Sequence, residues 1–201
     1  IPSDENIYGT FKYQLPDPDH ALKTIRDTFS SYGFHQIYSN SLQNEKESSI
    51  TGLVPVQMLN PLNVEMGFLR TSLLPGLLKA GDFNIKNSAK SFRLYELGNV
   101  HQSNGYGLKN INESQYLAGI IYGNKCEPSI HFKKIVETIY DIKGVVVDLF
   151  TKRLNMNIRF ESSDHYALDL AQNISVNNKQ IGYFGRLSKK ISFELGMDFD
   201  N

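Results

Sequence analysis

The chain has 201 residues, of which 40% are apolar and 21% are charged, a composition typical of a globular protein. Its 21 Lys and Arg balance its 21 Asp and Glu, so it lacks the basic excess of a free-standing nucleic-acid-binding protein, although a local basic patch could exist. A single cysteine, Cys126, excludes an internal disulfide and fits a reducing cytoplasm. No apolar run approaches the roughly 20 residues that span a bilayer. We therefore expect a cytoplasmic protein that does not enter a membrane.

The first third of the chain predicts an arm, a helix and a strand. Residues 1–16 are polar and aromatic and are expected to form an extended N-terminal arm. A helix should begin at Pro18, capped by Asp17, and end at Gly33. Residues 34–38 then read as a strand. The apolar face of the predicted helix consists of Ala21, Leu22, Ile25 and Phe29.

A leucine-rich stretch from residue 60 to 80 predicts a turn, a strand and a second helix. Asn60-Pro61 is a turn dipeptide, and Ser72 is a suitable N-cap for a helix with Pro75 in its first turn. Arg70 stands at the junction between strand and helix with no acidic neighbour in sequence, so its partner could lie in this chain or in another. One apolar stripe with helical spacing follows, made of Leu74, Leu77, Leu78, Gly81 and Ile85.

Residues 90–123 predict a long β-hairpin, with strands over 90–100 and 116–123 and an Asn- and Gly-rich loop between them. Arg93 and Glu96 lie three apart, so on a regular strand their side chains point to opposite faces. A β-bulge between them would bring both to one face, but nothing in the sequence requires one.

The last third predicts one long helix over 128–154, a strand over 158–161, and a hairpin with strands 169–176 and 181–187 joined by the turn 177–180. Asp141 and Lys143 should lie on different helix faces as surface charges. Alternating strands, helices and hairpins favour a single α+β domain over 1–201, built on an antiparallel sheet flanked by helices. Because the chain begins at Ile1 and stops abruptly, we expect it to be a piece of a longer protein.

No metal or phosphate site is predicted. No second His, Cys or paired carboxylate lies at ligand spacing around His35. Gly182 and Gly185 lie in a strand pattern rather than at a helix N-terminus, which favours close packing over phosphate binding.

Several strings resemble one family. Asn60-Pro61-Leu62, Glu65 and the run RTSLLPGLL from Arg70 to Leu78 closely resemble the core of the bacterial phenylalanine–tRNA ligase beta chain. RLYELG (93–98), YDIKG (140–144) and IGYFG (181–185) are similar to further strings of that family. The family's HP pair after the last glycine is absent, and its upstream HPGRSA string is reduced to Asp164-His165-Tyr166-Ala167. We therefore assign no functional role to His165.

The resemblance implies a class II aminoacyl-tRNA synthetase-like fold without catalytic residues. The segment 17–41 resembles motif 1 of that class, but no proline ends its strand. In active members, motif 2 places an Arg and a Glu two residues apart to hold ATP and orient the amino acid, whereas here the remnant is Arg93 and Glu96. Arg186 is the only candidate for the motif 3 arginine, and no apolar helix follows it. We expect a hairpin that has lost the catalytic pair.

The resemblance also implies partners. The holoenzyme would be an α₂β₂ heterotetramer that joins phenylalanine to tRNA(Phe) with ATP and Mg²⁺, catalysis residing in the alpha chain; this segment would hold neither cofactor. Two alternatives are an active class II ligase domain and a stand-alone protein-interaction domain. In the leading interpretation an apolar surface contacts the alpha chain, and its predicted residues are Leu22, Ile25, Phe29, Arg70, Leu73, Leu74, Leu77 and Leu78.

Overall fold

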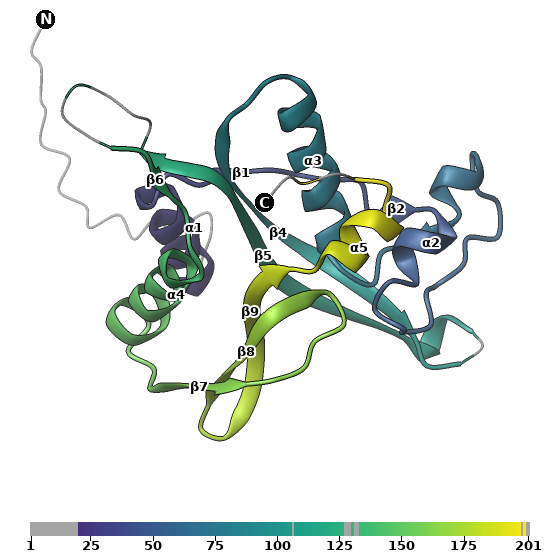
Figure 1. Cartoon of the computed structure of the whole chain (residues 1–201). Helices are drawn as coiled ribbons and strands as arrows, with labels where there is room; N and C mark the ends of the chain where they lie inside the picture. The colour runs from purple at the N-terminus through teal and green to yellow at the C-terminus, as the bar shows by residue number, and fades with distance from the viewer. Residues whose placement is uncertain (1–19, 106, 127–129, 131–132, 198, 200–201) are drawn as a thin grey trace, which may run out of the picture.

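A long two-stranded hairpin is the centre of the fold in the computed structural model, which describes residues 20–105, 107–126, 130, 133–197 and 199 (Figure 1). Strand β4 (Ser91–Ser103) pairs antiparallel with β5 (Ile111–Cys126) in a continuous register from Ser91 opposite Gly123 to Ser103 opposite Ile111. Strand β1 (His35–Gln36) adds to β4 in parallel, and β6 (Ile135–Val136) adds to β5, which gives the order β1-β4-β5-β6.

Helices cover both faces of this hairpin (Figure 1). On one face, α1 (His20–Ser31) and α4 (Ile139–Val147) enclose a core of Phe29, Phe34, Tyr95, Val145 and Leu149. On the other face, α3 (Leu74–Lys86) packs Leu73 and Leu77 against Leu94 and Val100. Because side chains alternate along a strand, consecutive residues such as Leu94 and Tyr95 enter different cores.

The segment between β1 and α3 forms a lobe beside the sheet (Figure 1). It contains β2 (Leu42–Gln43), the short helix α2 (Glu45–Ser48), the 3₁₀ turn η1 (Val64–Met66) and β3 (Phe68–Leu69), which pairs antiparallel with β2. Backbone bonds hold the loop between α2 and β3: Met58 N donates to Gly67 O, Leu69 N to Val56 O, and Ser103 N to Val54 O. A second 3₁₀ turn, η2 (Leu108–Asn110), precedes β5.

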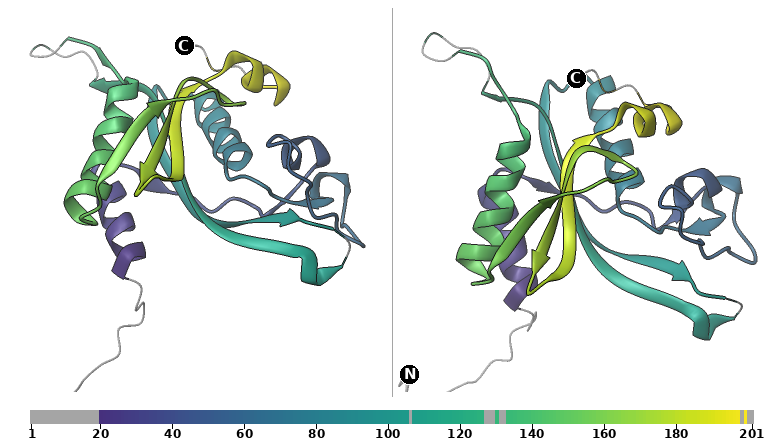
Figure 2. Two further views of the ribbon diagram at one scale, coloured as in Figure 1. Left: turned by 90° about the horizontal axis from the view of Figure 1, so that it is seen from below. Right: turned by 60° about the horizontal axis from the view of Figure 1, so that its bottom comes forward.

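A separate three-stranded sheet follows α4 (Figure 2). The chain continues from α4 through a π-helical turn, η3 (Asp148–Arg153), into β7 (Ile158–Ser162). Strands β8 (Leu168–Val176) and β9 (Lys179–Leu187) pair antiparallel, and α5 (Lys189–Glu194) follows. Leu78 of α3 packs with Ala167, Ile191 and Met197, which joins this sheet to the rest of the molecule. None of the described helices is long and apolar enough to cross a membrane.

The predicted class, α+β with an antiparallel sheet flanked by helices, is confirmed, but the helix predicted over 128–154 is confirmed only over residues 139–153. Strand β5 runs on to Cys126 and pairs with β6, so residues 135–136 are extended. Thr138 then caps α4 in a capping box with Asp141, and α4 begins only at Ile139. Asp141 therefore belongs to the capping box at the third position of α4 and also pairs with Lys125 at 2.6 Å, rather than being a solvated surface charge. Pro128 lies outside the described residues.

Other predicted boundaries shift by a few residues. Helix α3 begins at Leu74 with Leu73 as N-cap, while the Ser72 hydroxyl, predicted to be the cap, accepts a hydrogen bond from Leu74 N at 3.1 Å. The turn between β8 and β9 contains only Asn177 and Asn178, both left-handed with φ of 50° and 63°. Asparagine tolerates this conformation, which the tight hairpin turn requires. Gly33 ends α1 with φ of 75°, as expected, whereas Asp17, Pro18 and the arm over 1–16 lie outside the described residues.

Candidate functional site

Arg93 and Glu96 point to opposite faces of the hairpin. The β4–β5 register has no irregularity between Ser91 and Ser103, so no bulge brings the two side chains together. Arg93 lies on the face covered by α1, with its guanidinium over the Phe34 ring at 5.9 Å, whereas Glu96 faces α3 and the segment before it. The motif-2-like remnant therefore cannot form one binding pocket.

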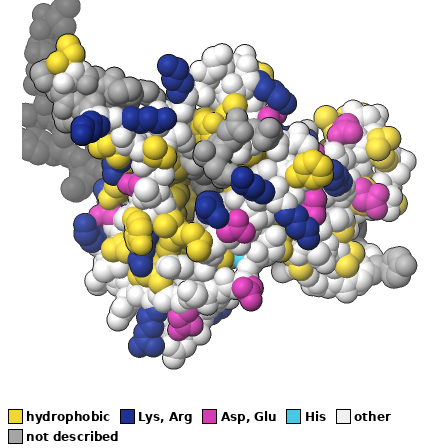
Figure 3. All heavy atoms as spheres, viewed as in Figure 1, with side chains coloured by type: hydrophobic (Ala, Val, Ile, Leu, Met, Phe, Trp, Pro, Cys, Tyr) yellow, Lys and Arg dark blue, Asp and Glu magenta, His cyan; other side chains and the backbone are white. Residues whose placement is uncertain are grey.

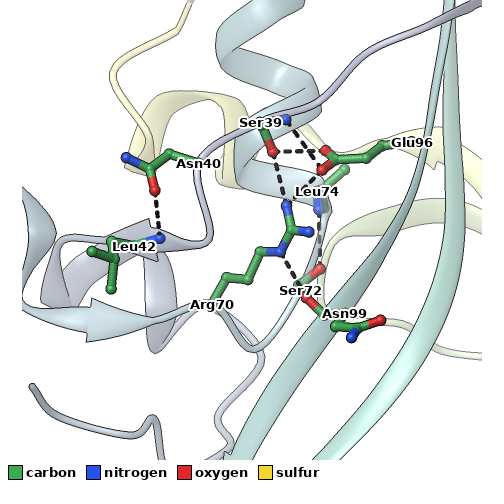
Figure 4. Close-up of polar contacts among 8 residues, drawn as sticks. All are labelled: Ser39, Asn40, Leu42, Arg70, Ser72, Leu74, Glu96 and Asn99. Atoms are coloured by element: carbon green, nitrogen blue, oxygen red, sulfur yellow. Dashed lines mark hydrogen bonds and ion pairs between the residues drawn. The ribbon is translucent and has the colours of Figure 1, made fainter.

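Glu96 is the centre of a buried polar cluster (Figure 4). Its Oε1 accepts a charge-assisted hydrogen bond from Arg70 Nη1 at 2.7 Å, and its Oε2 accepts one from Ser39 Oγ at 2.6 Å. The side chains of Arg70 and Glu96 are only 6% and 2% exposed. Arg70 also donates from Nε to Asn99 O at 2.8 Å and from Nη1 to Ser39 Oγ at 3.0 Å. The cluster answers the open question about Arg70, which pairs within its own chain.

Two glycines make room for this cluster. A Cβ atom at Gly98 would overlap Arg70 Nη2, and one at Gly76 would overlap Ser39 Oγ. Gly76 lies in the first turn of α3, so the backbone of this helix can closely approach the Ser39 side chain in the segment that follows β1. The site is thus shaped for the internal ion pair and is filled by it.

Arg93 forms hydrogen bonds and an ion pair on the face of the sheet opposite to Glu96. Its Nε donates to Glu137 Oε1 at 3.0 Å, and its Nη1 donates to Tyr32 O at 2.5 Å. The Glu137 side chain is 8% exposed, and its second oxygen, Oε2, is buried without a hydrogen-bond partner. Arg93 therefore links the end of α1 to the segment before α4, so its role is structural.

The predicted interface residues fall into two groups. Phe29, Arg70, Leu73, Leu77 and Leu78 are buried within this chain. Leu22 and Ile25 on α1 and Leu74 at the start of α3 are half-buried. Their role at a subunit interface stays a prediction. Apolar side chains that are far more accessible lie on the loop between α2 and β3, where Leu59, Leu62 and Val64 are 97%, 88% and 84% exposed.

The remaining candidates do not assemble into a catalytic site. His35 is exposed on β1, and no group of three His, Cys, Asp or Glu that could hold a metal ion occurs among the residues described. His165 lies against the rings of Tyr183 and Tyr166, at centroid distances of 3.8 and 4.4 Å, and burial lowers its pKa. Arg186 is 61% exposed, and its Nη2 lies 3.5 Å from Asp169 Oδ2.

Sequence reasoning missed the partnership of Ser39 and Gly98 with Arg70 and Glu96. Ser39, Arg70 and the β4 residues Glu96 and Gly98 come from three separate segments, so no spacing along the chain connects all of them. The one available signal was Arg70 itself, which lies in a leucine-rich stretch with no acidic neighbour in sequence, because a buried arginine requires a carboxylate from elsewhere in the fold.

Comparison with known proteins identifies a family. The model of the phenylalanyl tRNA synthetase beta chain CLM domain matches residues 1–200. A phenylalanine–tRNA ligase beta subunit of Staphylococcus haemolyticus (strain JCSC1435) is 28% identical over 198 residues, which cover 96% of this chain and 24% of that protein. One from Staphylococcus aureus (strain MRSA252) is 28% identical over 200 residues, covering 92% and 25%. This chain thus spans about a quarter of the length of these relatives.

A solved structure shares the fold. PylSc of Desulfitobacterium hafniense, a pyrrolysyl tRNA synthetase, superimposes with a TM-score of 0.58 at 14% sequence identity, over 81% of this chain and 54% of that one. The architecture is therefore that of a class II tRNA synthetase. Together with the match over residues 1–200, this shows that the chain belongs to the family of the phenylalanyl tRNA synthetase beta chain CLM domain.

Proposed function

We propose that this chain is a non-catalytic, class II synthetase-like core module of a phenylalanine–tRNA ligase beta subunit, which packs on a catalytic alpha chain in the cytoplasm. One observation carries the non-catalytic assignment: Glu96 is buried against Arg70, while Arg93 points to the other face and pairs with Glu137. A site for ATP needs charged groups that converge on the nucleotide. Here each of these groups is neutralised by a partner in its own chain.

The holoenzyme in this proposal is an α₂β₂ heterotetramer that attaches phenylalanine to tRNA(Phe) with ATP and Mg²⁺. The residues described here offer no cluster for the metal, and the motif-2-like Arg93 and Glu96 are each held in an ion pair within the chain. The alpha chain would therefore bind both, and the beta module would contribute a rigid scaffold beside it.

Phenylalanine-dependent pyrophosphate exchange tests the non-catalytic assignment. The assay should be run on the αβ holoenzyme and on the holoenzyme with Arg93→Gln. We expect both to exchange pyrophosphate at the same rate, because Arg93 is a structural tie. A large loss of exchange in a variant that keeps its heterotetrameric assembly would contradict the proposal, since it would place Arg93 in a working site.

The packing on the alpha chain is supported by the loop between α2 and β3, because it presents ordered apolar side chains to solvent. Leu59, Leu62 and Val64 are nearly fully exposed, and the backbone bonds of Met58 and Leu69 hold the loop in place. No charged residue occurs from position 48 to 64. Such a neutral, preformed surface suits an apolar protein partner and offers nothing to a phosphate backbone. Hydrophobic side chains of this lobe are visible at the right of Figure 3.

Charge placed on the loop tests the packing. We expect Leu59→Asp combined with Leu62→Asp to weaken assembly with the alpha chain at least about tenfold, since charge would be buried at the contact. Sedimentation of co-expressed subunits measures this. The matched control is Phe193→Asp on α5, which also alters a side chain that is 86% exposed. Wild-type assembly of the loop variant, or equal loss in the control, would contradict the assignment of this surface.

A further inference from the structure

The far end of the β7–β9 sheet carries a small polar cradle. Asn157 and Arg159 of the segment at β7 and Asn177 and Asn178 of the β8–β9 turn line a cavity of about 340 Å³. Figure 1 places this turn at the lower end of the molecule. Three amides and one guanidinium thus surround one hollow, in a part of the chain remote from the motif-2-like remnant.

The donors of the cradle are largely unused. Arg159 Nη1 donates a long, weak hydrogen bond to Asn178 Oδ1 at 3.4 Å, which shows that the guanidinium lies beside the turn. Within the described part of the chain, Arg159 forms no ion pair, and neither does Glu161, two residues further along the same face of β7. The remaining N–H groups of the guanidinium fork are therefore available to a ligand that accepts hydrogen bonds.

The local charge is basic although the chain as a whole is neutral. Residues 149–193 contain seven basic residues, Lys152, Arg153, Arg159, Lys179, Arg186, Lys189 and Lys190, and three acidic ones, Glu161, Asp164 and Asp169. Two of these, Lys152 and Arg153, are paired with Asp148, which leaves Arg159 and Lys179 as the charges next to the turn. Figure 3 shows Lys and Arg side chains at this lower end, together with acidic side chains.

We propose that this cradle binds a phosphodiester group of the tRNA backbone. The inference rests on the proposed function, which supplies the tRNA. A phosphodiester carries two charged oxygens that a guanidinium fork contacts in parallel, and side-chain amides donate to the same oxygens. None of the four residues that line the cavity is aromatic, so the cradle cannot stack a base and reads no sequence. Its task is to position the tRNA on the beta subunit.

Aminoacylation kinetics of the holoenzyme with Arg159→Gln test the proposal. We expect the KM for tRNA to rise roughly three- to tenfold, with kcat unchanged, because one phosphate contact is lost. The slope of log KM against log salt should fall by about one. Pyrophosphate exchange, which needs no tRNA, should keep its rate. Arg159→Lys should recover much of the loss, since a lysine still supplies a point charge.

The matched control is Arg186→Gln, which removes an exposed arginine at the opposite end of β9 and should change the KM for tRNA by less than about twofold. An unchanged KM and salt slope in Arg159→Gln would overturn the inference. So would an equal effect of the control, because the loss would then reflect net charge alone. If the wild-type holoenzyme aminoacylates tRNA and Arg159→Gln has the same KM for tRNA, only this inference fails. If the wild-type holoenzyme does not aminoacylate tRNA, the proposed function itself fails.

Two further measurements separate the source of the phosphate from an effect on folding. Free inorganic phosphate at millimolar concentration should not compete with tRNA at this site; competition abolished by Arg159→Gln would instead assign the cradle to a free anion and overturn the proposal. In the second, a photoreactive benzoylphenylalanine replaces Gln180, an exposed residue of β9 that pairs with Ser175, which is also the register partner of Arg159, so the cradle residues stay intact. We expect a cross-link to tRNA. The positive control carries the same photoreactive residue at an alpha-chain position that contacts tRNA. If this control forms a cross-link and the cradle variant does not, the inference is contradicted.

Discussion

Arg70 and Glu96 form the ion pair on which the non-catalytic assignment depends, and its burial makes it costly to disturb. Both side chains are almost fully excluded from solvent, and Ser39 and the Asn99 carbonyl form further hydrogen bonds with them. Removing one partner from a buried pair leaves the other charged and unpaired, which is far worse than losing a surface ion pair.

Arg70→Met is therefore expected to lower the free energy of unfolding by roughly 3–5 kcal/mol, because Glu96 stays buried without its partner. The double variant Arg70→Met with Glu96→Leu should lose less than Arg70→Met alone. Urea unfolding measures both. Lys86→Met, which removes an exposed partner of Asp82, is the control and should cost at most about 0.5 kcal/mol. A small loss in Arg70→Met would contradict the interpretation of Arg70 and Glu96 as a buried ion pair that stabilises the fold.

A pair of helical glycines offers a second test at this scale. Gly76 in α3 has no space for a Cβ beside Ser39, whereas a Cβ added at Gly144 in α4 would meet no atom within 4 Å. We expect Gly76→Ala to destabilise the protein by about 1–3 kcal/mol through overpacking, and Gly144→Ala to stabilise it by about 0.5–1 kcal/mol through helix propensity. Thermal unfolding of both variants checks the opposite signs, and equal signs would contradict the packing around Ser39.

At the scale of elements, the turn η3 after α4 is held by charge. Asp148 Oδ2 accepts from Arg153 Nε at 2.9 Å, and Lys152 Nζ lies 3.3 Å from Oδ1. Arg153 also donates to Ser31 Oγ at the end of α1, at 3.2 Å. These contacts, led by the bond from Arg153, hold the pKa of Asp148 below its ordinary value. They dock the π-helical turn against α1.

This shift predicts a pH dependence of stability. A carboxyl whose pKa is lower in the folded state contributes stability that is present above its unfolded pKa, about 3.9, and is lost as the pH falls through the lower folded value. The difference in unfolding free energy between wild type and Asp148→Asn should therefore be largest above about pH 5 and shrink below about pH 4. Urea unfolding at about pH 7 and about pH 3 measures it. A difference that does not depend on pH would show that the Asp148 ion pairs contribute nothing.

At the scale of the whole molecule, the hairpin separates two cores. The core under α1 and α4 contains Val145, and the core under α3 contains Val100, on opposite faces of the β4–β5 sheet. The two cores share the strands but have no buried member in common among the described residues. This layered arrangement leaves the α3 face filled by the polar cluster and its apolar neighbours.

The separation predicts additive mutations. Val100→Ala and Val145→Ala should each lower the free energy of unfolding by about 1–3 kcal/mol, since each removes two buried methyl groups and leaves a small cavity. The double variant should equal the sum of the two within about 0.5 kcal/mol, because distant sites without shared partners act independently. Denaturant unfolding of the three variants tests this, and a larger coupling energy would mean that the two faces form one core.

The sequence by itself determined the elements whose signals are local. The apolar spacing of residues 74–85 identified α3, and the Asn- and Gly-rich loop between the strand segments 90–100 and 116–123 identified the hairpin. The three-residue separation of Arg93 and Glu96 put them on opposite faces of a regular strand. The run RTSLLPGLL pointed to the family. Each of these depends on backbone periodicity or on a contiguous string, which needs no knowledge of distant contacts.

Only the tertiary structure decided the rest, since partners far apart in sequence set it. Residues 135–136 form strand β6 rather than the start of the predicted helix, because Val136 pairs with Asn124 of β5. The backbone N–H and C=O groups there are satisfied by this pairing with a distant strand, which the local apolar pattern does not reveal. In the same way, Ser39, Arg70 and Glu96 meet across 57 residues of chain, and the folded sheet, rather than any spacing, brings these three groups together.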